Sequence, residues 1–154
     1  MSTYFGDSSG VVKLYVTEIG SEWVDGLTDQ AQGHQVVIAR ITLVEVAAAL
    51  FRRVRGGTLS ASDAARAIQE LGHDLTSQFV IVDLTPTVVA KALILAEQYG
   101  LRGYDCVQLA SALVVQRERL ERGLSPLTLI SSDVELNHAA RKEHLQVEDP
   151  NTLP

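Results

Sequence analysis

Four acidic residues, spread over most of the chain, have the clearest potential for chemistry. They are Asp7, Glu45, Asp105 and Asp133. Carboxylates that are brought together repel one another, so clustering raises their pKa values unless a proton or a cation neutralises the group. Hard oxygen ligands in this number suit Mg²⁺ or Mn²⁺ better than zinc, which prefers His and Cys. An ion held in this way can activate a water and stabilise the leaving oxygen, which is the chemistry of phosphodiester hydrolysis.

The elements that must position these residues alternate between strand and helix. Short apolar or β-branched runs predict strands at 3–6, 36–39, 79–83, 127–130 and 145–147. Helical spacing, with start and stop residues, predicts helices over 9–15, 42–56, 60–71, 86–100, 104–120 and 133–142. The run FVIVD at 79–83 gives the strongest indication of a buried strand. The alternation predicts an α/β fold of three layers, with helices on both faces of a central parallel sheet of about five strands.

Three of the acids are expected beyond the carboxyl ends of strands, where ligands bind in such folds. Asp7 follows the first predicted strand, and Asp133 follows the strand at 127–130. Asp105 stands at the beginning of a helix after a short connection. Each of these residues, taken alone, is also explained as a helix N-cap, a position that favours Asp.

Glu45 lies one turn inside a predicted helix and is followed by the apolar segment 46–50. Thr42 precedes it at the spacing of a capping box, in which a Thr and a Glu satisfy each other's backbone N–H groups. The spacing alone therefore leaves two interpretations open for Glu45, a helix cap and a metal ligand.

The composition indicates one folded domain that spans residues 1–154, with 46% hydrophobic and 21% charged residues. We expect a cytoplasmic protein without membrane association, because neither a long uncharged apolar run nor a secretory leader is present. Cys106, the single cysteine, is expected to pack in the core.

The net charge of −6 argues against a general nucleic-acid-binding surface. A cation in an acidic pocket would reverse the local sign and could attract phosphate there. Arg52, Arg53 and Arg55 form a basic run, which we interpret as a solvated helix end in preference to an RNA-contacting edge.

The segments around all four acids resemble, in order, the acidic motifs of PIN-domain proteins, especially VapC-type toxins of toxin-antitoxin modules. Residues 4–16 (YFGDSSGVVKLYV) are similar to the opening of that family, and 42–46 (TLVEV) to its second motif. The third corresponds to 101–110 (LRGYDCVQLA), and the fourth to 131–133 (SSD) followed by Leu136. Gly6, Gly10 and Cys106 depart from the residues that are common at their positions.

The resemblance implies a PIN-like fold and a Mg²⁺- or Mn²⁺-dependent endoribonuclease activity. Asp7, Glu45 and Asp105 would be the core ligands, and Asp133 would complete the site. Ser9 and Ser131 would form hydrogen bonds to waters or carboxylates around the metal. The resemblance further implies a homodimer that cleaves cellular RNA and is neutralised by a cognate antitoxin covering the acidic pocket.

Two other functions fit parts of the sequence. The segment GDSSG at 6–10 matches the G-x-S-x-G pattern of serine hydrolases, in which Ser8 would be the nucleophile. Its partners would be Asp105 or Asp133 and His138 or His144, but no upstream loop is present to supply an oxyanion hole. A PIN-like domain without catalysis, which serves as a binding module, is the second alternative.

Overall fold

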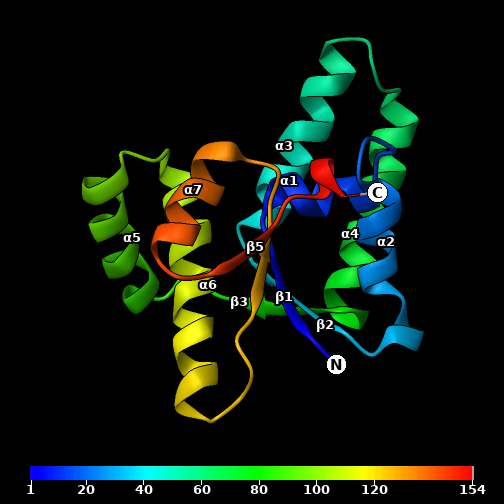
Figure 1. Cartoon of the computed structure of the whole chain (residues 1–154). Helices are drawn as coiled ribbons and strands as arrows, with labels where there is room; N and C mark the ends of the chain where they lie inside the picture. The colour runs from blue at the N-terminus through cyan, green and yellow to red at the C-terminus, as the bar shows by residue number, and fades with distance from the viewer. Residues whose placement is uncertain (154) are drawn as a thin grey trace.

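The strands and helices alternate in the computed structural model, which describes residues 1–153 (Figure 1). The strands are β1 (Thr3–Gly6), β2 (Gln35–Ala39), β3 (Phe79–Val82), β4 (Thr128–Ile130) and β5 (Gln146–Glu148). The helices are α1 (Ser8–Val11), α2 (Ser21–Thr28), α3 (Thr42–Arg55), α4 (Ala61–Ser77), α5 (Pro86–Tyr99), α6 (Gly103–Glu121) and α7 (Val134–Lys142). Short 3₁₀ turns lie at η1 (Val12–Leu14), η2 (Gln30–Gln32) and η3 (Pro150–Thr152).

The described strands form one parallel sheet in the order β3-β2-β1-β4-β5. In its register, Phe5 of β1 lies between Val37 of β2 and Leu129 of β4. The first three strands extend the sheet in one direction and the last two extend it in the other. The order thus reverses between β1 and β4, and the loops that follow these two strands are where an open parallel sheet binds ligands.

Each face of the sheet packs against its own group of helices. Val37 and Ile38 are neighbours in β2 and point to opposite faces, as successive strand residues do. Val37 joins a buried cluster with residues of α5, α6 and α7, whereas Ile38 joins one with residues of α3 and α4. Figure 1 shows α5, α6 and α7 together on one side of the strands and α2, α3 and α4 on the other. The predicted three-layer arrangement with a five-stranded parallel sheet is confirmed.

Several local predictions need correction. The FVIVD run forms β3, which within residues 1–153 pairs with β2 alone and is an edge strand, so Val80 is 44% exposed. α4 continues past 71 to Ser77, because Leu75 still packs against the α3 and α4 cluster. Helix α2 is not among the predicted helices.

The contact of α1 with β4 explains one departure from the family pattern. A Cβ at Gly10 would lie 2.9 Å from the carbonyl oxygen of Ile130, so only glycine lets α1 approach β4 this closely. Cys106 of α6 is buried in the apolar cluster formed by α5, α6, α7 and the sheet, as predicted. Among residues 1–153, no helix combines the length and the apolar character that a bilayer span needs.

Candidate active site

Asp7 and Asp133 lie beyond the ends of adjacent strands and both cap helices. The Asp7 carboxylate follows β1 and accepts a hydrogen bond from the Gly10 N–H at 2.9 Å. The Asp133 carboxylate lies shortly after β4 and accepts one from the Leu136 N–H at 2.8 Å. The capping interpretation is correct for these two residues, and it also places both carboxylates at the point where the strand order reverses.

Glu45 and Asp105 do not cap their helices. Asp105 lies in the first turn of α6, whose N-cap is Arg102. α3 begins at Thr42 after the N-cap Ile41, so of the two interpretations of Glu45 the capping box with Thr42 is wrong. The side chains of Thr42 and Glu45 instead accept hydrogen bonds from the buried amide of Gln108.

Three of the four acids line a single cavity of about 460 Å³. They are Glu45 from α3, Asp105 from α6 and Asp133 from the start of α7. Asp7 is only 2% exposed and is not among the lining residues. It is connected to the cavity through Ser9, which lines it and donates to Asp7 Oδ1 at 2.7 Å.

Serines join the ends of β1 and β4 around Asp7. The Ser131 hydroxyl donates to Asp7 Oδ2 at 3.0 Å and accepts the N–H of Asp133 at 3.1 Å. The Ser9 hydroxyl accepts the N–H of Ser132 at 2.8 Å. Ser9 and Ser131 therefore hydrogen-bond the same carboxylate and also hold the loop that carries Asp133.

Burial and mutual repulsion raise the pKa of two of these acids. Burial raises the pKa of Asp7 to about 7, and the charge of Glu45 adds to the effect, although hydrogen bonds from Ser9, Gly10 and Ser131 oppose it. The pKa of Asp105 is raised to about 6, first by burial and then by the charges of Asp133 and Glu45. The carboxylates therefore lie close enough to repel one another, and a cation between them would relieve that repulsion.

The donor set of this cavity fits a hard divalent ion. Among residues 1–153, no three acidic, histidine or cysteine side chains converge closely enough to form a complete metal site. The cavity nevertheless presents carboxylate and hydroxyl oxygens, from Glu45, Asp105, Asp133, Ser8 and Ser9. Mg²⁺ usually keeps several waters and takes further oxygens from a substrate phosphate, so it does not require a closed set of protein ligands.

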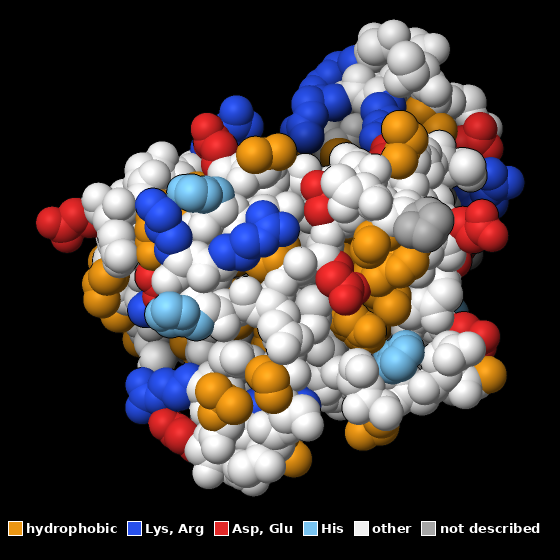
Figure 2. All heavy atoms as spheres, in the orientation of Figure 1, with side chains coloured by type: hydrophobic (Ala, Val, Ile, Leu, Met, Phe, Trp, Pro, Cys, Tyr) orange, Lys and Arg blue, Asp and Glu red, His pale blue; other side chains and the backbone are white. Residues whose placement is uncertain are grey.

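The cavity also has a basic and an apolar wall. Arg52 of α3 and Arg102 at the start of α6 line it, together with Val44 and Ala48. Arg52 belongs to the basic run at the end of α3, and Figure 2 shows Lys and Arg side chains over this part of the molecule. On the rest of that face, the Lys and Arg side chains are scattered among uncharged, His and acidic ones. The interpretation of this run as a solvated helix end is thus incomplete for Arg52.

Two side chains at the site were not identified in this role from the sequence. Ser8 donates from Oγ to Glu45 Oε2 at 3.1 Å, and Gln108 donates from Nε2 to Glu45 Oε1 at 2.7 Å. The available signal for Gln108 was a polar residue between apolar neighbours, one turn after Asp105. Ser8 was considered only as a nucleophile. Its hydroxyl donates to Glu45, whereas both His138 and His144 are exposed.

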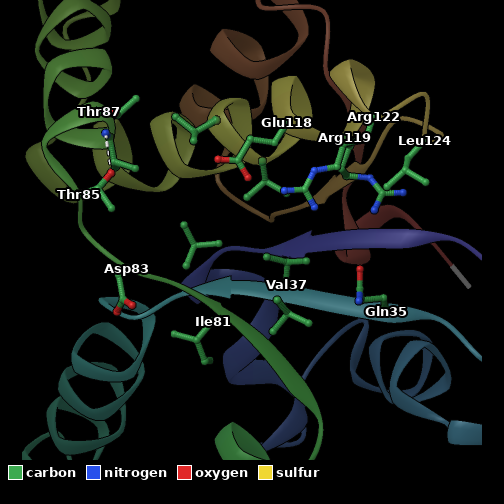
Figure 3. A pocket seen from close by; sticks show the side chains of 15 residues that line it. Gln35, Val37, Ile81, Asp83, Thr85, Thr87, Glu118, Arg119, Arg122 and Leu124 are labelled. Atoms are coloured by element: carbon green, nitrogen blue, oxygen red, sulfur yellow. Dashed lines mark hydrogen bonds between the residues drawn. The ribbon is translucent and has the colours of Figure 1, made fainter.

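A larger cavity, of about 660 Å³, lies elsewhere, between β2 and β3 on one side and α6 on the other (Figure 3). Its floor includes Val37 and Ile81, and Arg119 and Arg122 extend over it. It contains two carboxylates, of which Asp83 is ion-paired with Arg40. Size alone therefore does not identify the site, because the smaller cavity collects the acids.

Known proteins are similar to this chain in sequence and in fold. The family model of the PIN domain matches residues 4–142. Ribonuclease VapC45 of Mycobacterium tuberculosis (strain CDC 1551 / Oshkosh) is 37% identical over 115 residues, which are 75% of this chain and 78% of that protein. The crystal structure of PAE2754 from Pyrobaculum aerophilum is similar with a TM-score of 0.64 at 22% identity, over 98% of this chain and 91% of that one. A toxin-antitoxin complex from Klebsiella pneumoniae gives a TM-score of 0.55 at 19% identity, over 86% of this chain and 87% of that one.

Proposed function

The chain belongs to the PIN domain family, within its VapC branch, and on that premise we propose that it is a Mg²⁺- or Mn²⁺-dependent endoribonuclease. It acts as the toxin of a VapBC-type toxin-antitoxin module. The observation that carries the proposal is that Glu45, Asp105 and Asp133 line one cavity beside buried Asp7. The relative named ribonuclease VapC45 supports RNA as the substrate.

In this mechanism Glu45, Asp105 and Asp133 would hold the divalent ion from the walls of the cavity, and Asp7 would hold it from beneath them. When bound, the ion supplies positive charge for the scissile phosphate and acidifies the attacking water. Ser9 and Ser131 hold the Asp7 carboxylate by hydrogen bonds to its two oxygens. The oxygen of the attacking water forms a bond to phosphorus while a carboxylate of the cavity accepts its proton. The P–O bond to the leaving ribose oxygen breaks, and that oxygen takes up a proton from solvent.

Arg52 and Arg102 bind the RNA backbone in this proposal. Both are exposed and line the same cavity as the acids. The chain carries a net charge of −6, so these guanidinium groups offset local repulsion between the protein and RNA phosphates. The phosphates next to the scissile bond are their expected partners.

The proposal includes two protein partners. A cognate antitoxin is the first, and it would cover the acidic cavity. The toxin-antitoxin complex among the similar structures supports an antitoxin as a partner. Helix α3 offers apolar side chains to such a partner, because Val44 at the cavity is 59% exposed and Phe51, elsewhere on the helix, is 48% exposed. A homodimer is the second partner, and the exposed Leu93 and Ile94 of α5 provide an apolar surface for it. Co-expression with the adjacent reading frame tests the antitoxin by co-purification, and light scattering tests the dimer.

A cleavage assay on total cellular RNA tests the activity. We expect cleavage with Mg²⁺ or Mn²⁺, loss of cleavage in EDTA and recovery when the metal is restored. Because water is the nucleophile, the products should carry no 2′,3′-cyclic phosphate, which attack by the ribose 2′-hydroxyl would leave. Cleavage that persists in EDTA, or cyclic phosphate ends, would refute the metal-dependent mechanism.

The two alternatives predict different results in the same samples. A binding module without catalysis would bind Mn²⁺ and leave RNA intact. A serine hydrolase would react at Ser8 with a fluorophosphonate probe and would not need metal. The hydrogen bond from Ser8 to Glu45 supports a role at the acidic cavity instead.

A further inference from the structure

Gln108 is a polar side chain with no exposed surface, in the second turn of α6. A buried amide is costly unless it is hydrogen-bonded. Its Nε2 donates to Thr42 Oγ1 at 2.9 Å and to Glu45 Oε1 at 2.7 Å. Both partners belong to the first turn of α3, so the amide connects α6 to that turn.

The orientation of the Gln108 amide is set by the groups that accept hydrogen bonds from its nitrogen. The Glu45 carboxylate can only accept, so the nitrogen of Gln108 has to face it. Gln108 Oε1 is buried and has no hydrogen-bond partner in the described part of the chain. The side chain thus leaves its own acceptor unsatisfied while both of its N–H groups are used. That arrangement is unfavourable for a residue that serves packing alone.

Glu45 is held from two sides as a result. Gln108 contacts Oε1 from the buried side, and Ser8, which lines the cavity, contacts Oε2. A glutamate side chain has several freely rotating bonds, and ordering it during metal binding costs conformational entropy. Two donors from separate elements fix the carboxylate before the ion arrives.

We propose that Gln108 is the positioning residue that fixes the Glu45 carboxylate for the divalent ion; this inference rests on the proposed function. Asp105 and Gln108 lie one turn apart on α6. A single stretch of α6 therefore supplies one ligand directly and orients a second ligand on α3. Residues that orient metal ligands typically contribute about 10- to 100-fold to metal affinity or activity.

Calorimetric titration of the metal-free protein with Mn²⁺ tests this role. Gln108→Met fills nearly the same space but cannot donate a hydrogen bond. We expect its Mn²⁺ affinity to fall by about 10- to 100-fold. Thr42→Val is the matched control, because it removes the other partner of the same amide and leaves the bond to Glu45. It should keep Mn²⁺ affinity within about threefold of the parent, even if both variants lower the melting temperature.

The outcomes separate this inference from the proposed function. If the parent does not bind Mn²⁺, the proposed function and this inference both fail. If the parent binds Mn²⁺ and Gln108→Met binds equally well, only the positioning role is wrong. Equal losses in Gln108→Met and Thr42→Val would also contradict it, because they would indicate a general effect of the contact between α3 and α6. If Gln108→Met does not fold, Ser8→Ala provides a second test, because it removes the other hydrogen-bond donor to Glu45. Unchanged Mn²⁺ affinity in Ser8→Ala would contradict the idea that the Glu45 carboxylate has to be held.

Discussion

The hydroxyl of Ser131 donates a hydrogen bond to Oδ2 of Asp7 at 3.0 Å, across 124 positions of sequence. This contact joins the loops after β1 and β4, where the order of the strands reverses. It also belongs to a fully buried environment, in which an ionised carboxylate is unfavourable. Burial accordingly raises the pKa of Asp7 to about 7, despite three hydrogen bonds to its oxygens.

The first prediction concerns Asp7 and the stability of the metal-free protein. The folded pKa of about 7 lies above the unfolded value of 3.8, so folding favours the protonated form. The stabilisation from this proton is complete below pH 3.8 and is lost as the pH rises towards 7. Asp7→Asn cannot ionise and should be more stable than the parent by on the order of 2 to 4 kcal/mol at pH 8. Urea unfolding in EDTA between pH 4 and 8 measures this difference.

The difference between parent and Asp7→Asn should grow from pH 4 to 7 and then stay constant. Asp63→Asn, which changes a carboxylate that is ion-paired with Arg66 at the surface, is the control. Its difference from the parent should not follow this course. If the free energy of unfolding of Asp7→Asn differed from that of the parent by the same amount at pH 4 and pH 8, Asp7 would not be an unfavourable buried charge.

The second prediction concerns the pH dependence of metal binding. Burial and the charges of Asp133 and Glu45 raise the pKa of Asp105 to about 6. Because metal ligands must be deprotonated, Mn²⁺ affinity should rise with pH between about 5 and 7, and binding should release protons. Calorimetry at pH 6 in two buffers of different ionisation enthalpy measures that release. Equal affinity at pH 5 and pH 7.5, with no proton released, would contradict the assignment of Asp105 as a ligand.

The third prediction concerns the arginines of the cavity. Arg52→Ala and Arg102→Ala should each weaken RNA binding several-fold and lower the salt dependence by about 0.7 in the slope of log K against log salt. Fluorescence anisotropy with labelled RNA, in the Asp105→Asn background to prevent cleavage, measures both quantities. Arg117→Ala is the control, because Arg117 is ion-paired with Glu121 and does not line the cavity. Unchanged affinity in both test variants would place the RNA on another surface.

Much of the fold could be predicted because its sequence signals are local. The apolar runs and the start and stop residues gave all five strands and their alternation with helices. Parallel pairing and coverage of both faces then follow from that alternation. The exposure of β3 could not be predicted in this way. It depends on which strand ends at the edge of the sheet, and the FVIVD run has the same composition in either position.

The candidate site could be predicted only in part, because some of its contacts join residues that are distant in the sequence. Asp7 and Asp133 follow strands, and this local pattern gave their position. Glu45 had two interpretations, which the spacing from Thr42 could not separate. The deciding contact is the Gln108 amide from a distant helix, and such a contact depends on tertiary packing rather than on periodicity.

The most direct test of the account compares Asp105→Asn with Asp83→Asn in a single-turnover RNA cleavage assay at saturating Mn²⁺. Asp105 lines the acidic cavity, whereas Asp83 is an exposed carboxylate at the other, larger cavity. We expect Asp105→Asn to lose cleavage by at least about a thousandfold, with its fold retained by circular dichroism. Asp83→Asn should cleave at the rate of the parent. A folded Asp105→Asn protein that cuts RNA as fast as the parent would contradict the claim that these carboxylates form the catalytic metal site.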